Sequence, residues 1–400
     1  MLHSSPLSRP LARPLSSSLA RLVMGVGLAA LPLSVTPSAP SALSASLAKP
    51  ASKKPGKRLE ADAAMSAHPL PALSDEARAQ LNALRPDPEP ESLVRNSHYW
   101  VSNEHNHQVW LEPLKAVSGG GYVGVGTDQN YLLAGWSRPE VLILMDFDGE
   151  IAKLHEIYEY FFAISASPKT FHLRWKRAYA EDSKEKLAAY FMERFERLQP
   201  NLSDKQRAKL VKQRVKIYQL TRGLIDRRLA RTHKKYKELK QPTFLSDQAQ
   251  YDHLRSLWAQ GRVLAIRGDL TADQTMLDIA HALKAMNLSL NTLYLSNAEQ
   301  YFELTPGYRR NIIELPWGER GVALRTLGWR VWGFLDEDEK YHYNYQGGAN
   351  FRAWMERGRY KKPGQMLRQR TKTEPFGTST LDAPPVEGKR APQIAPVPAR

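Results

Sequence analysis

An early part of the chain alternates apolar runs and a helical pattern in the order typical of a parallel sheet. Residues 122–125 favour a β-strand, and residues 141–145 form an apolar run suited to a buried parallel strand. Between them, residues 129–136 have a helical pattern that begins after Thr127 or Asp128, two residue types that cap helices well. Strand, glycine turn, helix and strand together predict a βαβ unit.

A second unit of the same kind lies downstream. Residues 262–266 and 290–295 predict strands, and residues 272–286 predict the helix between them. The aromatic and polar run at 341–345 is typical of a half-buried strand. Two such units predict an α/β domain with an open, mostly parallel sheet.

Polar residues follow the strand ends of both units. Asp269 comes after the third predicted strand, and the run SNAEQY at 296–301 comes after the fourth. Because ligands bind at the carboxyl edge of an open α/β sheet, we expect these residues to share one edge with Gly124 and Asp146. The alternative is that the first two residues of the run only cap the next helix.

The turn after the first strand has the sequence Gly124-x-Gly126, which favours a nucleotide-like ligand. Asp146 follows Gly126 by 20 residues, about where an acid reaches ribose hydroxyls in dinucleotide-binding folds. Gln129 replaces the third glycine of that fingerprint, and Asp128 puts a negative charge where a pyrophosphate would bind. These features argue against NAD and FAD and are compatible with S-adenosylmethionine, which has no phosphate. The alternative is that the glycines serve only close packing of strand and helix.

Several segments resemble one bacterial family. They are Val101-Ser102-Asn103-Glu104, residues 119–135 (GGGYVGVGTDQNYLLAG), residues 268–274 (GDLTADQ) and residues 292–302 (TLYLSNAEQYF). Over residues 99–330, the chain resembles an uncharacterised family with a Rossmann-like, class I S-adenosylmethionine-methyltransferase-like fold. Leu270 departs from the family pattern, which usually has Phe after Gly-Asp.

The resemblance implies this fold and no established reaction. Together with the reading of the residues themselves, it gives a set of candidate cofactor-binding residues: Gly124, Gly126, Asp128, Gln129, Asn130, Asp146, Asp148 and Asp269. The candidate substrate-binding residues are Tyr294, Ser296, Asn297, Glu299 and Gln300. No residue is assigned a catalytic role.

Aromatic residues and prolines divide the chain into three parts. All nine Trp and all seventeen Tyr lie between Tyr99 and Tyr360, whereas the two ends hold most of the 27 Pro. Aromatic side chains anchor cores, and Pro-rich chain without them does not repay its ordering entropy. We therefore predict one folded domain at 96–360, a disordered linker at 49–95 with a short helix near 74–84, and a disordered Pro-rich tail at 361–400.

Residues 1–48 have the order of regions found in secretory signal peptides. Three Arg residues precede a 14-residue apolar run at 22–35, and small residues at 46–48 suit cleavage. The run is short for a membrane span, and no other stretch is longer. We therefore expect an exported protein, periplasmic or secreted, with no transmembrane span after cleavage. The alternative is a disordered extension on a cytoplasmic protein.

The net charge of +16 is concentrated in one segment. Residues 205–240 hold fourteen Lys or Arg and only two acids. A basic helical insertion is predicted at 203–240, with one stripe formed by Leu210, Ile217, Leu220 and Leu224. Such a helix can bind a membrane surface, nucleic acid or an anionic polymer, and nucleic acid is the least expected because no reading motif is present. The alternative is that the stripe packs on the domain and the cations are solvated.

Other chemistries find little support in the composition. The chain has no Cys, which excludes disulfides, thiolate metal sites and Cys nucleophiles. Glu104, His105 and His107 lie close in sequence, but they lack a further ligand at a defined spacing. We therefore expect no metal site.

Two functions from different classes follow. In the first, a methyltransferase-like enzyme holds S-adenosylmethionine over Gly124 and Gly126, with Asp146 on the ribose, Asp269 near the adenine and 296–301 facing the methyl acceptor. In the second, an exported, non-enzymatic protein keeps the same shell, binds another small molecule or a partner, and contacts an anionic envelope or membrane surface through the basic helix. The signal-like N-terminus favours the second, because S-adenosylmethionine is a cytoplasmic cofactor.

Overall fold

The computed structural model describes residues 56–61, 69–328, 340–375 and 377–385. All of them belong to one compact unit, Lys54–Arg400. The predicted signal segment at 1–48 lies outside the described residues, as does the last part of the predicted tail, 386–400.

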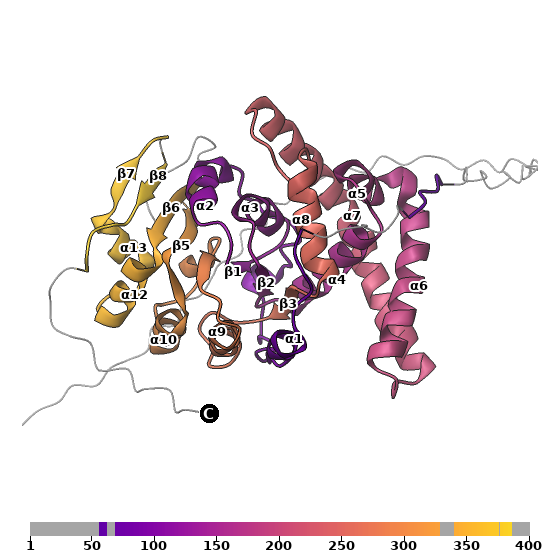
Figure 1. Cartoon of the computed structure of the whole chain (residues 1–400), viewed down its shortest axis with the longest axis horizontal. Coiled ribbons are helices and arrows are strands. Elements are labelled where there is room, and N and C mark those ends of the chain that lie inside the picture. The colour runs from indigo at the N-terminus through magenta and orange to yellow at the C-terminus, as the bar shows by residue number, and fades with distance from the viewer. Residues whose placement is uncertain (1–55, 62–68, 329–339, 376, 386–400) are drawn as a thin grey trace, which may run out of the picture. The chain divides into compact units, whose positions relative to one another are not determined.

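The unit is an α/β domain built on one open, mostly parallel sheet (Figure 1). Among the described residues, the sheet has eight strands in the order β3-β2-β1-β4-β5-β6-β8-β7. The first five of these pair in parallel, and β6 runs antiparallel to β5. The strands are β1 (Gly121–Val125), β2 (Val141–Asp146), β3 (Val263–Arg267), β4 (Leu290–Tyr294), β5 (Trp317–Gly328), β6 (Tyr341–Gly347), β7 (Thr371–Thr373) and β8 (Thr378–Thr380).

Helices connect the strands and cover both faces of the sheet. The helices before β3 are α1 (Asp75–Asn82), α2 (Leu111–Ala116), α3 (Gln129–Ser137), α4 (Gly149–Ala163), α5 (Pro168–Trp175), α6 (Ala180–Leu198), α7 (Asp204–Glu238) and α8 (Gln248–Ala259). Those after β3 are α9 (Thr275–Ala285), α10 (Pro306–Glu314), α12 (Gly348–Arg357) and α13 (Pro363–Met366).

The two βαβ units predicted from the sequence are present. The strands β1 and β2 are buried over most of their length, as the apolar runs require of central parallel strands. The helix α3 between them is followed by Arg138, which caps its C-terminus in a left-handed conformation with φ of 44°, and then by Pro139. The prediction of an α/β domain with an open, mostly parallel sheet is therefore confirmed.

Alternating side chains of the central strands enter two separate cores. Tyr122, Leu142 and Leu144 face one core, which α3, α4 and α8 complete. Val123 and Ile143 face the other, which α1, α9 and α10 complete. Figure 1 shows these two groups of helices on opposite sides of the sheet. The domain is thus three layers deep, with the sheet in the middle.

The strand order reverses beside β1. The chain builds β1, β2 and β3 outward in one direction and then returns through α9 to β4, on the other side of β1. The connections after β1 and after β4 therefore leave the sheet in opposite directions. A crevice forms at the carboxyl ends of strands where this happens.

The predicted linker and tail are wrong in part. Leu73, Leu81 and Leu84 are buried in the domain core, and Arg85 forms a bidentate ion pair with Asp278 on α9, so residues 69–95 are not a disordered linker. The predicted short helix in this segment is α1. After residue 360, Met366, Leu367 and Leu381 are also buried, and β8 pairs with β6. A few apolar residues are enough to order these two segments, because they pack on an apolar surface that the rest of the domain already presents.

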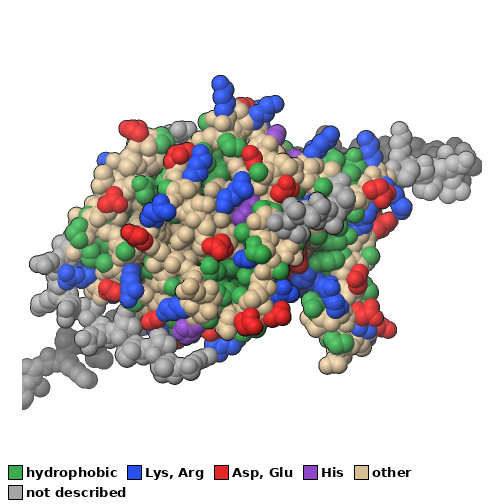
Figure 2. Space-filling model, viewed as in Figure 1, with side chains coloured by type: hydrophobic (Ala, Val, Ile, Leu, Met, Phe, Trp, Pro, Cys, Tyr) green, Lys and Arg blue, Asp and Glu red, His purple; other side chains and the backbone are tan. Residues whose placement is uncertain are grey.

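The predicted basic insertion is the last part of a larger helical connection. Between β2 and β3 the chain forms five helices, and α7 packs against α4, α5 and α6. Ser203, the residue before α7, caps the helix N-terminus and forms a capping box with Gln206. Figure 2 shows basic side chains projecting where α7 ends.

The stripe predicted for this helix is partly wrong. Leu220 and Leu224 are exposed, by 58% and 38%. The buried face instead includes Val211, Ile217, Tyr218 and Ile225, together with two arginines, Arg214 and Arg228. The hydrophobic pattern did not predict this face because two of its buried residues are arginines. Each of them pairs with a carboxylate of the domain.

Among the helices of the described residues, none combines the length and the hydrophobicity that crossing a membrane requires.

Candidate functional site

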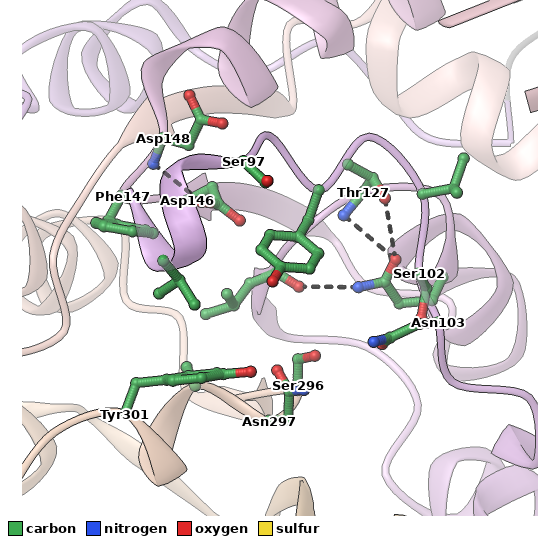
Figure 3. A pocket seen from close by; sticks show the side chains of 17 residues that line it. Ser97, Ser102, Asn103, Thr127, Asp146, Phe147, Asp148, Ser296, Asn297 and Tyr301 are labelled. Carbon is green, nitrogen blue, oxygen red and sulfur yellow. Dashed lines mark hydrogen bonds between the residues drawn. The ribbon is translucent and has the colours of Figure 1, made fainter. Parts of the chain in front are cut away.

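A cleft opens where the strand order reverses, at the carboxyl ends of β1, β2 and β4. Its volume is about 110 Å³, and about 730 Å³ when the space open to solvent is included. Figure 3 shows side chains from the ends of all three strands around one hollow, together with Ser97, Ser102 and Asn103 from the segment before α2. Four separate stretches of sequence therefore build this cleft.

The turn after β1 forms one wall of the cleft, and hydrogen bonds from the side chains of Gln129 and His155 fix its backbone. Gly126, at φ of 94°, lies in the left-handed region that favours glycine. The Gln129 side chain donates to the carbonyl of Val125 and accepts from the N–H of Thr127, over 3.2 Å in each case. From α4, the ring of His155 donates from Nε2 to the Gly126 carbonyl across 2.9 Å. The turn therefore reaches the cleft as a fixed backbone loop.

Two acids at the end of β2 form a second wall. The N–H of Asp148 donates to Asp146 Oδ1 over 3.0 Å, and Asp148 itself caps α4 and contacts His98 Nδ1 over 2.7 Å. Burial raises the pKa of Asp146 to about 7; the N–H of Asp148 opposes this rise, and the charge of Asp148 adds to it. Asp146 is therefore a carboxyl that changes charge near neutral pH while facing the cleft.

The residues after β4 form the third wall. Ser296, Asn297 and Tyr301 line the cleft opposite the two acids (Figure 3). Ser296 adopts a left-handed φ of 50°, which turns the chain sharply at the end of β4. Tyr301 is 46% exposed and Tyr99, which also lines the cleft, is 42% exposed. Two aromatic rings are thus available at the mouth of the cleft.

A buried carboxylate lies directly behind this wall. Glu104 is fully buried and accepts hydrogen bonds from Ser296 Oγ over 2.7 Å, from His107 Nε2 over 3.0 Å and from the hydroxyls of Tyr294 and Thr326. Burial raises the pKa of Glu104, but these hydrogen bonds, with that of His107 the strongest, outweigh burial and leave the pKa below its usual value. Tyr294 and Ser296 were predicted as substrate-binding residues, but no pattern in the sequence predicted that they would contact Glu104.

The neighbouring His107 is neutral. Burial lowers its pKa by more than the contact with Glu104 raises it. Glu104 is therefore the charged member of the pair, and His107 donates to it. Among the described residues, no group of three or more His, Asp or Glu side chains is placed to hold a metal ion.

Asp128 also has a role that the sequence did not reveal. Its Oδ1 accepts from the N–H of Ser102 over 2.9 Å, and its Oδ2 accepts from Nε of Arg228 over 2.7 Å. Both members of the ion pair are at least 94% buried. Asp128 thus joins the cleft segment at Ser102 to α7, and its side chain does not cap α3.

Comparison with known families places the chain. A sequence model described as "Domain of unknown function (DUF7790)" matches residues 99–382. The chain belongs to this family. A comparison with curated proteins finds no match.

The match clarifies where the folded DUF7790 domain ends. It runs past Tyr360 to residue 382, and so it includes β7 and β8. The boundary predicted at 360 was therefore too early. Trp and Tyr content failed to mark it because the last strands consist mainly of threonine.

Six of the predicted site residues line the cleft of the DUF7790 domain. They are Gly126, Gln129, Asp146, Asp148, Ser296 and Asn297. They come from three separate strand ends, which is the convergence expected of a parallel sheet edge.

The other predicted residues lie around the cleft without lining it. A Cβ at Gly124 would overlap Asn130 Oδ1 and the ring of Tyr122, so this glycine serves close packing of β1 and α3. Asn130 accepts from the Tyr122 hydroxyl and donates to the Val125 carbonyl, so it supports the turn from below. Asp128, as described, contacts Arg228.

The remaining predicted residues are tied into the domain. Asp269 accepts from the N–H and hydroxyl of Thr271, and Gln300 accepts from the N–H of Gly328. Tyr294 donates to the buried Glu104 described above. Glu299 is fully buried and contacts Arg325 and Tyr308. Their polar side chains therefore shape the edge of the sheet.

Proposed function

We propose that the DUF7790 domain is a Rossmann-like, methyltransferase-like enzyme that binds S-adenosylmethionine or a related nucleoside in the cleft at β1, β2 and β4. The observation that carries this proposal is the position of Asp146, at the end of β2 and in the same cleft as the Gly126 turn. An acid at this place accepts hydrogen bonds from ribose hydroxyls in doubly wound nucleotide-binding sheets. The strand order β3-β2-β1-β4-β5 supports the same assignment.

The start of α3 favours a nucleoside without phosphate. A pyrophosphate would bind at the N–H groups of this helix end. Asp128 already brings a carboxylate there, and Arg228 neutralises it from the side of α7. S-adenosylmethionine carries no phosphate and needs no such site.

The rings at the cleft mouth suit the base of such a ligand. Tyr99 and Tyr301 line the cleft and are each more than two-fifths exposed. Stacking of a base on an aromatic side chain contributes about 1–3 kcal/mol. Methyl transfer mainly requires in-line placement of acceptor and sulfonium, so the proposal needs no conspicuous nucleophile.

Isothermal titration of the full chain with S-adenosylmethionine, S-adenosylhomocysteine and adenosine tests this proposal. We expect saturable binding that Asp146→Asn weakens by about tenfold, the effect of losing one charge-assisted hydrogen bond. The matched control is Asp273→Asn, an exposed aspartate paired with Arg310. Absence of binding by all three nucleosides, or equal loss in both variants, would remove the proposal.

A second candidate is an exported, non-enzymatic binding protein. The exposed face of α7 favours it, because Leu220 and Leu224 lie in water on a helix rich in Lys and Arg. Such a face suits an anionic envelope polymer or membrane surface. Sedimentation of the full chain with anionic and neutral vesicles tests it, with Leu220→Ser combined with Leu224→Ser as the variant. N-terminal sequencing of the protein from its cells separates the two candidates, since removal of residues near 1–48 supports export.

A further inference from the structure

The cleft at β1, β2 and β4 is acidic, although the chain as a whole is basic. The formal net charge of the chain is +16, yet the described residues that line the cleft include no Lys, Arg or His. The carboxyl groups of Asp146 and Asp148 do line it, whereas His98, which contacts Asp148, does not. Charges of one sign along a concave wall concentrate their field in the cleft. The cleft therefore favours a ligand that carries positive charge.

A third carboxylate lies behind the wall opposite these two acids. Glu104 is fully buried, and its four hydrogen-bond donors are all neutral groups, from Ser296, Tyr294, Thr326 and His107. Within the described part of the chain, no Lys or Arg forms an ion pair with it. Its charge is therefore held by hydrogen bonds and is not neutralised by a cation there.

Ser296 connects this buried charge to the cleft. Of the four donors to Glu104, Ser296 alone lines the cleft. A carboxylate only accepts hydrogen bonds, so the single proton of the Ser296 hydroxyl points toward Glu104 Oε1, 2.7 Å away. Tyr294 lies beside Ser296 but gives its own proton to Glu104 as well. Ser296 Oγ therefore offers the cleft its lone pairs, which accept from an N–H or O–H group of a ligand.

A neighbouring amide extends this acceptor surface. Asn297 also lines the cleft, and its Nδ2 donates to the Tyr341 hydroxyl over 3.4 Å. This orientation leaves Asn297 Oδ1 to accept from a ligand. Two adjacent residues after β4 thus present acceptor atoms on the same wall.

We propose that Ser296 Oγ and Asn297 Oδ1, backed by the charge of Glu104, form a subsite for a protonated amine. An ammonium group combines several N–H donors with a positive charge, so it matches both the acceptor atoms and the acidic field. The identity of the ligand rests on the proposed function: the amine belongs either to the side chain of the bound nucleoside or to a separate methyl acceptor. Asp146 lies on the opposite wall (Figure 3), so different walls contact the ribose and the amine.

Isothermal titration of the full chain with two matched nucleosides tests the first source. One is the adenosine 5′-thioether with a 3-aminopropyl side chain, and the other is its propyl analogue, which lacks only the amine. We expect the amine to tighten binding about tenfold, the effect of one charge-assisted hydrogen bond, and Ser296→Ala to remove most of this advantage. The wild-type comparison needs no variant, so it stands even where a substitution disturbs folding.

A second titration tests the other source. If the amine belongs to a separate acceptor, the two nucleosides bind equally. Butylamine then binds saturably to the chain loaded with the propyl nucleoside, and Ser296→Ala weakens this binding about tenfold.

The matched control is Thr326→Val, which removes the other hydroxyl that donates to Glu104 Oε1 but does not line the cleft. We expect this variant to keep the preference for the amine. Equal loss in Thr326→Val and Ser296→Ala would show that Ser296 acts only through the Glu104 cluster, and would overturn the subsite.

The two proposals can fail separately. Nucleosides that bind without any effect of the amine in either titration, or a wild-type preference in Ser296→Ala, would overturn the amine subsite and leave the proposed function standing. Butylamine that binds the unloaded chain through Ser296, while neither nucleoside binds, would remove the proposed function and support the subsite.

Discussion

Arg228 Nε lies 2.7 Å from Asp128 Oδ2, and this ion pair connects the middle of α7 to the residue before α3. The two residues are 100 positions apart in the chain. Because Asp128 also accepts from the N–H of Ser102, the pair fixes the long helical connection, the start of α3 and one wall of the cleft together.

We predict that Arg228→Met lowers the free energy of unfolding by about 3–5 kcal/mol, since it leaves the Asp128 carboxylate buried without its partner. Urea denaturation at pH 7 measures this. The double variant Arg228→Met with Asp128→Asn should recover much of the loss, and the exposed neighbour Arg227→Gln should change stability by less than about 0.5 kcal/mol. Additive losses in the double variant would contradict the pairing.

Glu104 gives a second prediction about buried charge. Glu104→Gln replaces an acceptor of four donors by an amide that accepts through only one atom, and we expect a loss of about 2–4 kcal/mol at pH 7. Because the folded pKa of Glu104 is lowered, its contribution is present above about pH 4.5 and disappears as the pH falls through the folded value. The variant should therefore lose less stability on acidification than the wild type. The control Glu112→Gln removes an exposed partner of Lys115 and should have little effect.

Because of His155 and His253, we expect the stability of the fold to depend on pH in a range above that of Glu104. Burial lowers the pKa of each to about 4, against a backbone hydrogen bond that raises it. An unfolded histidine takes up its proton near pH 6.5, so the free energy of unfolding should fall as the pH drops from 6.5 to about 4. Each histidine accounts for up to about 3 kcal/mol of that fall.

Urea denaturation between pH 7 and pH 4 checks this dependence. His155→Leu should be less stable at pH 7, since it loses its bonds to Gly126 and Tyr131, but its stability should depend less steeply on pH. His281→Gln, at an exposed position, should keep the wild-type slope. A slope in His155→Leu equal to that of the wild type would contradict the assignment.

Asp146 should destabilise the fold at high pH. Its raised pKa means that the unfolded carboxyl ionises first, near pH 4, so its unfavourable effect grows as the pH rises from 4 to about 7. Asp146→Asn should then increase the free energy of unfolding at pH 8 by about 2 kcal/mol, a value reduced because Asp146 is partly exposed to solvent. At pH 4 the same substitution should change it little. Asp273→Asn serves as the control. A stabilisation that is the same at both pH values would argue against this titration.

The segment before the cleft should contribute directly to stability. Leu81 on α1 is 2% exposed, and we expect Leu81→Ala to lower the free energy of unfolding by about 2–4 kcal/mol. Leu239→Ala, at a leucine 43% exposed, should change it by less than about 0.5 kcal/mol. Thermal and urea denaturation measure both. An unchanged stability in Leu81→Ala would mean that residues 69–95 do not pack as described.

The local sequence determined the central elements of this protein. Apolar runs, the glycine turn and the helical pattern between them predicted β1, α3 and β2, and the same kinds of pattern predicted β3, α9 and β4. These features depend on neighbours within a few positions, where periodicity and turn preferences act. Because the strands are parallel, the same patterns also placed Gly126, Asp146 and Ser296 on one edge of the sheet.

Only the tertiary structure decided which charged groups are buried and what they contact. Arg228 reads as one more cation of a basic helix, and Glu104 reads as a polar residue in a loop, yet each is buried against partners far away in the chain. The same holds for Leu81 and Leu381, whose segments look too polar to fold alone. A residue's burial depends on the surface that the rest of the chain presents to it, and that surface exists only after the sheet and helices have assembled.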